Sequence, residues 1–218
     1  MTLSEIEQEI IDELLARRPD LAACVQALEA LHRALIACYD AGGKLLVCGN
    51  GGSHADSVHI VGELMKSYER RRPLPDAMAR ALEGLPWDEE LAAHLEGGLP
   101  AIALGCSGAL KTAIENDSPL RDIAFAQEVC ALAKPGDVFL GISTSGNAVN
   151  VVMAMSTAKA AGCTTAALTG PHGGKLAIHA DIAIKAPGGS TKVIQEAHLC
   201  LYHTTCGLIE AHYFPERR

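Results

Sequence analysis

The chain alternates between short apolar runs and longer stretches in which apolar residues recur every three or four positions. Short apolar runs bounded by glycine, proline and polar residues predict buried strands, whereas the longer pattern predicts amphipathic helices. Strands that alternate with helices indicate a parallel sheet covered by helices on both faces. Five strands are expected, at residues 45–48, 99–104, 138–142, 164–168 and 182–186.

Helical periodicity covers most of the remaining chain, at residues 4–40, 53–68, 110–115, 123–133, about 148–161 and 193–210. Ser4 is the expected N-cap of the first helix, with Glu7 completing a capping box. Residues 73–98 break the alternation, because they are helical in composition, begin with proline and contain Trp87, the chain's only tryptophan. We therefore expect one domain over 1–218, with N-terminal helices at 4–40 and a helical insert at about 73–98.

Two turns follow apolar strands and open helical patterns: the segment 49–53 reads Gly-Asn-Gly-Gly-Ser, and 143–147 reads Ser-Thr-Ser-Gly-Asn. A helix N-terminus offers unpaired N–H groups and a partial positive charge, and small residues let a ligand approach them. The spacing fits neither a P-loop nor a dinucleotide fingerprint. Because ligands of parallel sheets bind at the carboxyl ends of strands, the pair predicts a phosphorylated small molecule held there. The simpler alternative for 143–145 is an ordinary N-cap.

Two helices carry side chains suited to metal binding and acid–base chemistry. His59 and Glu63 share one helix face, as do Gln195 and His203. Together they would form a four-ligand site for a cation such as Zn²⁺, and a Glu facing a His can serve as general base and general acid. Taken singly, each pair also fits a surface ion pair or a packed histidine, which is the preferred interpretation of His198.

Composition narrows the class of protein. With 218 residues, 49% of them hydrophobic, the chain suits one α/β domain with its own core. A net charge of −8 argues against nucleic acid as a partner. The eight cysteines include no C-x-x-C pair and are expected to be reduced thiols of a cytoplasmic protein. We expect no signal peptide and no apolar run near the ~20 residues that span a bilayer, hence no membrane partner.

These motifs together resemble the SIS (sugar isomerase) domain family and, within it, the phosphoheptose isomerases. The matching segments are 48–54, His59 with Glu63, Asn116-Asp117, 140–147, 168–170, and 194–196 with His203. They span nearly the whole chain outside the insert. The 143–147 turn alone is typical of the wider family, whereas its combination with the other segments is more specific.

The resemblance implies a flavodoxin-like three-layer α/β sandwich and a homotetramer with active sites at subunit interfaces. It implies an aldose–ketose isomerase that converts sedoheptulose 7-phosphate to D-glycero-D-manno-heptose 7-phosphate through an enediol, towards heptose nucleotides. One Zn²⁺ per subunit would be held by the residues matching zinc ligands, and Glu63 and His203 would move protons. The expected zinc ligands are His59, Glu63, Gln195 and His203; the expected substrate contacts are Asn50, Gly51, Gly52, Ser53, Glu63, Asn116, Asp117, Ser143, Thr144, Ser145, Lys192 and Gln195.

The chain departs from the family pattern in three places. Ala148 stands where many members carry a phosphate-binding serine, and Lys192 stands where some carry aspartate and could add a cation for phosphate. The insert is the third departure and is expected to pack beside the site mouth, against its own subunit or a neighbour. Two other functions stay open: a non-catalytic phosphosugar-binding protein (a sensor or a replication-initiation partner), or an isomerase of another sugar phosphate. Only an enzyme needs both Glu63 and His203.

Overall fold

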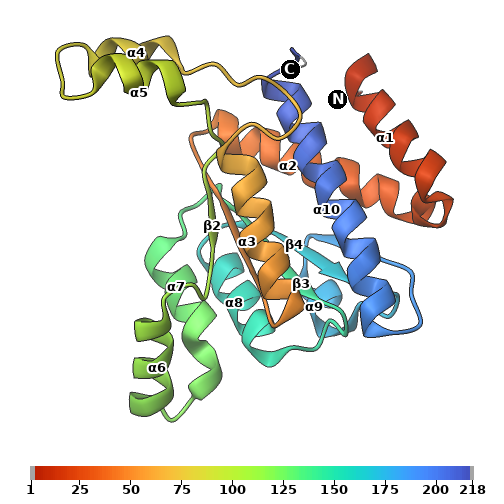
Figure 1. Ribbon diagram of the computed structural model, residues 1–218. Helices are drawn as coiled ribbons and strands as arrows, with labels where there is room; N and C mark the ends of the chain where they lie inside the picture. The colour runs from red at the N-terminus through yellow and green to blue at the C-terminus, as the bar shows by residue number, and fades with distance from the viewer. Residues whose placement is uncertain (1–2, 217–218) are drawn as a thin grey trace.

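A computed structural model describes residues 3–216 of the chain (Figure 1). Its centre is a parallel sheet of five strands in the order β2-β1-β3-β4-β5. This order is the flavodoxin-like, doubly wound one, in which the direction of winding reverses between β1 and β3. The strands lie where the sequence predicts them, with β2 shorter than expected. Their bounds are β1 Leu45–Gly49, β2 Ala101–Ala103, β3 Val138–Ser143, β4 Thr164–Thr169 and β5 Ile182–Lys185.

The side chains of each strand alternate between two hydrophobic cores, as the pleat requires. In β3, Leu140 and Ile142 face one core and Phe139 faces the other. Three helices cover the first face: α2 (Val25–Asp40), α3 (Gly52–Met65) and α10 (Thr191–Tyr213). The second face is covered by α7 (Ala124–Leu132), α8 (Val149–Ala160) and α9 (Gly174–His179), the last of which was not predicted. The expected three-layer sandwich is confirmed.

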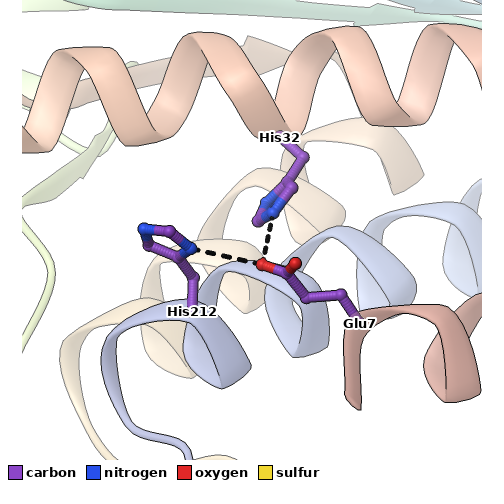
Figure 2. Close-up of side chains that lie close together, drawn as sticks. All are labelled: Glu7, His32 and His212. Carbon is purple, nitrogen blue, oxygen red and sulfur yellow. Dashed lines mark hydrogen bonds and ion pairs between the residues drawn. The ribbon is translucent and has the colours of Figure 1, made fainter. Parts of the chain in front are cut away.

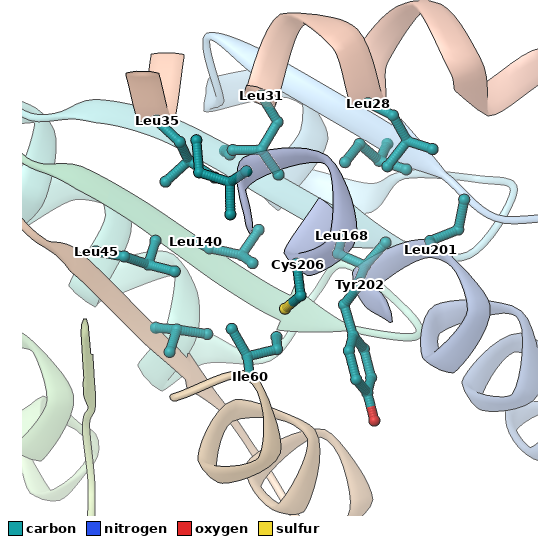
Figure 3. Close-up of a cluster of buried hydrophobic side chains, with 14 of the residues drawn as sticks. Leu28, Leu31, Leu35, Leu45, Ile60, Leu140, Leu168, Leu201, Tyr202 and Cys206 are labelled. Atoms are coloured by element: carbon teal, nitrogen blue, oxygen red, sulfur yellow. The ribbon is translucent and has the colours of Figure 1, made fainter. Parts of the chain in front are cut away.

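The first core is filled by leucines of α2 that lie over the sheet and against α10 (Figure 3). Leu28, Leu31 and Leu35 are at most 1% exposed, and Leu201 of α10 and Ile60 of α3 close the layer. Burying a leucine stabilises the fold by about 1.5–3 kcal/mol. This packing fixes α3 and α10, which carry the candidate site, relative to the sheet.

The N-terminal helical region is divided into α1 (Glu5–Arg17), a 3₁₀ segment η1 (Pro19–Cys24) and α2, because Pro19 cannot continue the first helix. The predicted capping box is confirmed: Glu7 N–H donates to Ser4 Oγ at 3.3 Å, and Ser4 N–H donates to Glu7 Oε2 at 2.7 Å.

One helical segment of the described chain, Pro19–Asp40, is long and apolar enough to cross a membrane by length and composition. This differs from the expectation that no apolar run approaches that length. The same test is passed by core helices, and the apolar side of α2 is buried against the sheet here. The apolar character of the segment is therefore explained by core packing.

The insert forms a hairpin of α4 (Asp76–Leu82) and α5 (Asp88–His94) that projects from the body (Figure 1). Both helices lie within the described residues, and neither has a buried residue. The two chain segments that connect the hairpin to the body, called its neck here, are joined by a hydrogen bond from Gly97 N–H to the Arg72 carbonyl at 3.1 Å. Trp87 at its tip is 71% exposed. The expected packing of the hairpin on its own subunit is thus not seen, and packing on a neighbour stays a prediction.

Candidate active site

The two glycine- and serine-containing turns meet at the carboxyl end of the sheet, because β1 and β3 are neighbouring strands. Gly51, at φ 56°, precedes the first turn of α3. The side-chain amides of Asn50 and Asn150 donate to each other at 2.9 Å and join the first turn to the start of α8 (Val149–Ala160), the helix that follows the second turn. Asn150 was missed by the sequence analysis, since nothing in its spacing shows that it faces Asn50.

The second turn is held by backbone contacts. Gly146 N–H donates to the Ser143 carbonyl at 2.9 Å, and Gly170 N–H donates to the Thr144 carbonyl at 3.0 Å. Ser143 is buried at the end of β3, whereas Ser145 Oγ accepts from Asn147 N–H at 3.2 Å. The hydroxyl of Ser145 therefore supports the turn, so a local structural role would accompany any role in ligand binding.

A pocket opens beside the first turn, with an empty volume of about 720 Å³ that is partly open to solvent. Besides Asn50 and Gly51, its lining includes His54, Lys111 and Arg121. Lys111 lies on α6 (Gly108–Asp117) and Arg121 on the 3₁₀ segment η2 (Arg121–Ile123), and the lining also includes Glu115, which lies 3.3 Å from Lys111 Nζ, and Asp122. Neither Lys111 nor Arg121 was singled out from the sequence, because only the fold places these two elements beside Asn50.

Asn116 and Asp117 do not line this pocket. They are the last two residues of α6, and the Asn116 amide donates to the Asp117 carboxylate at 2.7 Å. The described chain therefore does not bring them to the turn at Asn50. Their expected contact with the sugar stays a prediction.

Two turns further along α3, His59 and Glu63 approach His203 of α10. His59 Nε2 lies 3.0 Å from Glu63 Oε1, and the rings of His59 and His203 are 5.0 Å apart, edge to face. The other ring nitrogen of His59 lies 3.0 Å from the Tyr202 hydroxyl, which fixes the orientation of the imidazole. The fold thus brings together three of the side chains predicted for metal binding and acid–base chemistry.

Burial sets the electrostatics of this cluster. It lowers the pKa of His203, an effect that the neighbouring His59 reinforces. The Nε2 atom of His203 is buried and has no hydrogen-bond partner among residues 3–216. Burial raises the pKa of Asp56, although the Tyr202 hydroxyl donates to it at 3.4 Å. Asp56 and Tyr202 were missed as supporting residues, since they bear on the site only through His59.

Gln195 lies at the other end of the site. Its amide packs against Gly52, where any Cβ would collide with it. Gln195 and His203 are eight residues apart on α10, which is about 12 Å of helix rise. Lys192 is exposed in the first turn of α10. Within one chain, Gln195 and Lys192 therefore lie beside the turns rather than beside His203.

The His59–Glu63–His203 cluster has the donor chemistry that Zn²⁺ requires. Two ligands of a tetrahedral zinc ion are separated by about 3.3 Å, close to the distance between His59 Nε2 and Glu63 Oε1. The unpartnered Nε2 of His203 supplies a third donor. These three side chains carry donors of the kind that Zn²⁺ binds, but in the described chain their ligand atoms do not lie close enough together to form such a group, and Gln195 lies further along α10. In the described chain, the group of three donors whose ligand atoms all lie within 4.8 Å is a different one: Glu7, His32 and His212.

A buried ion pair fixes the backbone at the end of α3. Arg72 Nε lies 2.7 Å from Glu210 Oε1, and both side chains are fully buried. The Arg72 guanidinium also donates to the carbonyls of Glu63 and Leu64, which have no helical partner at a helix C-terminus. Glu210 accepts from the backbone N–H groups of residues 68–70. The ion pair thereby ties the end of α3 to α10 beside the candidate site.

Known proteins share both this fold and these sequence features. The model of the SIS domain matches residues 21–97 and 89–170, two segments that overlap within the insert. A probable phosphoheptose isomerase of Thermoplasma volcanium is 40% identical over 186 residues, covering 85% of this chain and 82% of the relative. The phosphoheptose isomerase of Trichlorobacter lovleyi is 37% identical and covers 97% and 95%. The structure of phosphoheptose isomerase from Neisseria gonorrhoeae is 32% identical, with a TM-score of 0.68 and coverage of 91% and 94%.

The structure combines a parallel sheet, two glycine- and serine-containing turns at its carboxyl edge and a His–Glu–His cluster nearby, and solved relatives with this fold include sugar-phosphate isomerases. The chain belongs to the SIS domain family and, within it, to the phosphoheptose isomerases. It is accordingly an isomerase.

Proposed function

We propose that the protein interconverts sedoheptulose 7-phosphate and D-glycero-D-manno-heptose 7-phosphate, an aldose–ketose isomerisation on a route to heptose nucleotides. The observation that carries the proposal is that Glu63, His59 and His203 lie together. Among the described residues, Nε2 of His203 has no hydrogen-bond partner. A protein that only bound phosphosugars would need the turns but no paired acid and base.

Substrate binding is assigned to the carboxyl edge of the sheet. The phosphate would bind at Ser53 and the 143–145 turn, near the N-termini of α3 and α8, with Lys192 adding positive charge. Asn50, Gly51, Gly52, Gln195, Asn116 and Asp117 are assigned to the sugar. From Gly52 to His59 is about 10 Å along α3. A seven-carbon sugar with phosphate at one end and carbonyl at the other suits a site with these two separated ends.

The chemistry requires one proton to move between neighbouring carbons. The Glu63 carboxylate would take the proton from C1 of the ketose, and the electron pair of that C–H bond would form the C1–C2 double bond of an enediol. The C2 oxygen would be protonated as its carbonyl opens, with His203 as the acid. Return of a proton to C2 and loss of the O1 proton then yields the aldose.

We infer that Zn²⁺ is the cofactor from the donor types of this cluster and from the family resemblance; the donors would have to move closer together to hold it. His59, Glu63 and His203 would hold it, and the family resemblance adds Gln195. When bound, Zn²⁺ would polarise the sugar oxygens at C1 and C2 as a Lewis acid.

We also propose a homotetramer in the cytoplasm. Apolar side chains remain exposed on α3 and α10, including Val58 at 46%, Met65 at 58% and Leu199 at 39%, which a subunit interface would bury. All eight cysteines lie within residues 3–216 and are free, as expected for a reducing compartment.

Incubation of the purified chain with sedoheptulose 7-phosphate tests the proposal, with the product resolved as ketose or aldose. We expect a heptose 7-phosphate aldose to accumulate to equilibrium, and fructose 6-phosphate to react far more slowly. Faster conversion of another ketose phosphate would reassign the substrate. Tight binding of the heptulose phosphate with no aldose formed would favour a binding protein instead.

A further inference from the structure

A second cluster of metal-binding side chains lies away from the candidate active site, between α1, α2 and α10 (Figure 2). Glu7 of α1, His32 of α2 and His212 of α10 converge there. Glu7 is 4% exposed and His32 is 2% exposed. Their ligand atoms all lie within 4.8 Å of one another. Three helices that are distant in sequence thus direct polar side chains to one buried point.

The geometry of this cluster centres on one carboxylate oxygen. His32 Nε2 lies 2.9 Å and His212 Nδ1 lies 3.2 Å from Glu7 Oε1 (Figure 2). Neighbouring ligands of a tetrahedral Zn²⁺ are separated by about 3.3 Å. The two nitrogen-to-oxygen distances come within about 0.4 Å of that spacing, and the two nitrogens lie within 4.8 Å of each other.

The charges at the cluster also favour a cation. Glu7 Oε2 accepts a hydrogen bond from Ser4 N–H at 2.7 Å, whereas Oε1 faces the two imidazoles. Within the described chain, this carboxylate makes no ion pair with lysine or arginine. The other ring nitrogen of His32, Nδ1, is buried and has no hydrogen-bond partner among residues 3–216. A buried carboxylate with no lysine or arginine beside it would be balanced by a bound divalent cation.

We propose that Glu7, His32 and His212 form a structural site for a divalent transition-metal cation of the Zn²⁺ class, separate from the candidate active site. Two imidazoles and one carboxylate are ligands that Zn²⁺ prefers. The side chain of His212 is 25% exposed, which leaves a path for the cation to enter and for a water molecule to occupy the fourth position.

The site ties α1 to the body of the protein. Apart from this cluster, α1 packs chiefly on η1 and α10. Further along α1, Glu13 and Arg17 form one wall of a groove whose other residues include Tyr68 and His203. A cation held at Glu7 would therefore also fix the helix that borders His203.

Zinc binding by the full-length chain tests the proposal. The active-site donors are first removed in a His59→Ala/His203→Ala background, and the protein is stripped with a chelator and titrated with Zn²⁺ alone. We expect about one Zn²⁺ per chain by elemental analysis, a higher Tm, and protection of α1 from limited proteolysis. In the same background, His212→Gln should lose the ion and both effects.

His179→Gln, at an exposed histidine of α9, is the matched control and should bind zinc like the background. His212→Gln is the preferred variant because this side chain is only partly buried; Glu7→Gln, which keeps the hydrogen-bonding shape but not the charge, is the second. Replacement of Zn²⁺ by Co²⁺ should give the visible absorption of a tetrahedral site, again lost in His212→Gln. A background chain that binds no Zn²⁺, or equal binding with and without His212, would overturn the proposal and leave the proposed isomerase activity untouched.

Discussion

Two glycines at the carboxyl edge of the sheet lie where the surrounding atoms leave little space for a side chain. Gly146 has φ 66°, and a Cβ there would collide with the backbone of Gly173. Gly52 is less restricted, because a Cβ there would meet only the side-chain amide of Gln195, which can move aside. Any larger residue at either position would move the turn or the amide beside it. These glycines therefore set the shape of the opening in which the phosphate and sugar are proposed to bind.

Removing hydroxyl groups from the second turn tests phosphate binding. Ser143→Ala and Ser145→Ala should each raise KM for the sugar phosphate and leave kcat less affected, because a hydrogen bond to a charged group contributes about 1.5–3 kcal/mol. Ser156→Ala, at an exposed serine of α8, is the control. Steady-state kinetics decide the matter: unchanged KM in both variants would place the phosphate elsewhere, with Ser53 and Lys192 the next candidates.

Some site residues could be predicted from the sequence and others could not. His59 and Glu63 are four apart on one helix and Ser143–Ser145 are consecutive, so local geometry alone unites them. Other residues come close to the site only after β1 pairs with β3 and α3 packs on α10: Asn150, Tyr202, Lys111 and Arg121. Their relation to the site is a product of tertiary packing, and local spacing carries no signal for it.

At the scale of elements, the site depends on the pairing of α3 with α10. The Arg72–Glu210 ion pair holds the end of α3, the following segment and α10 together. Both helices were expected from their periodicity. The ion pair was not, because Arg72 lies among three consecutive arginines of which only Arg72 enters this pair.

The strand positions were predicted well, because a short apolar run between glycine, proline and polar residues rarely forms anything but a buried strand. The helix α9 was missed because its six residues are too few to show helical periodicity.

Replacing Arg72 with leucine should destabilise the protein. The substitution leaves the Glu210 charge buried without its cation, and breaking such a pair typically costs about 3–5 kcal/mol. Arg71→Leu, at the exposed neighbouring position, should change the free energy of unfolding far less. Denaturant unfolding of both variants measures this difference, and equal stability of the two would show that the pair contributes little.

The junction of β4 and β5 should show a defined pH dependence. Burial of Asp181 is outweighed by hydrogen bonds from Lys159 and Thr165, which lower its pKa to about 2 from 3.8. A carboxyl whose pKa is lowered on folding stabilises the protein above its unfolded pKa, and this contribution is lost as pH falls through the folded value. Asp181→Asn should therefore reduce stability at pH 7, with a deficit that shrinks as pH falls from 3.8 towards 2.

Urea unfolding at neutral and acidic pH measures that deficit. Asp76→Asn, at an exposed aspartate of the insert, serves as the control and should show no such trend. A deficit for Asp181→Asn that is the same at both ends of the pH range would contradict the assignment.

At the scale of the whole molecule, contacts within the domain do not explain the apolar side chains of the insert. Its helices bury no residue within the described chain, and its exposed side chains include Met78 at 50%, Leu85 at 53% and Trp87 at 71%. Apolar side chains gathered on a projecting hairpin are typical of a contact with another chain. This exposure supports the prediction that the insert packs on a neighbouring subunit, whereas its position near the site mouth stays a prediction.

Deletion of residues 76–94 with a short glycine bridge tests the role of the insert. The neck is already closed between Arg72 and Gly97, so the body should fold without the hairpin. We expect altered kcat or KM, or a smaller assembly by light scattering, and Trp87→Ala should show part of the effect. A folded tetramer with unaltered kinetics would leave the hairpin without a role in catalysis.

The central claim is that Glu63 and His203 perform proton transfer in a heptose phosphate isomerase, and turnover of sedoheptulose 7-phosphate by single variants tests it most directly. Glu63→Gln and His203→Ala should each lower kcat by about 10²–10⁴-fold, the usual contribution of a general acid or base, while circular dichroism and Tm show a folded protein. Glu5→Gln, at an exposed position of α1, should match the wild type. Near wild-type turnover in either active-site variant would contradict the account.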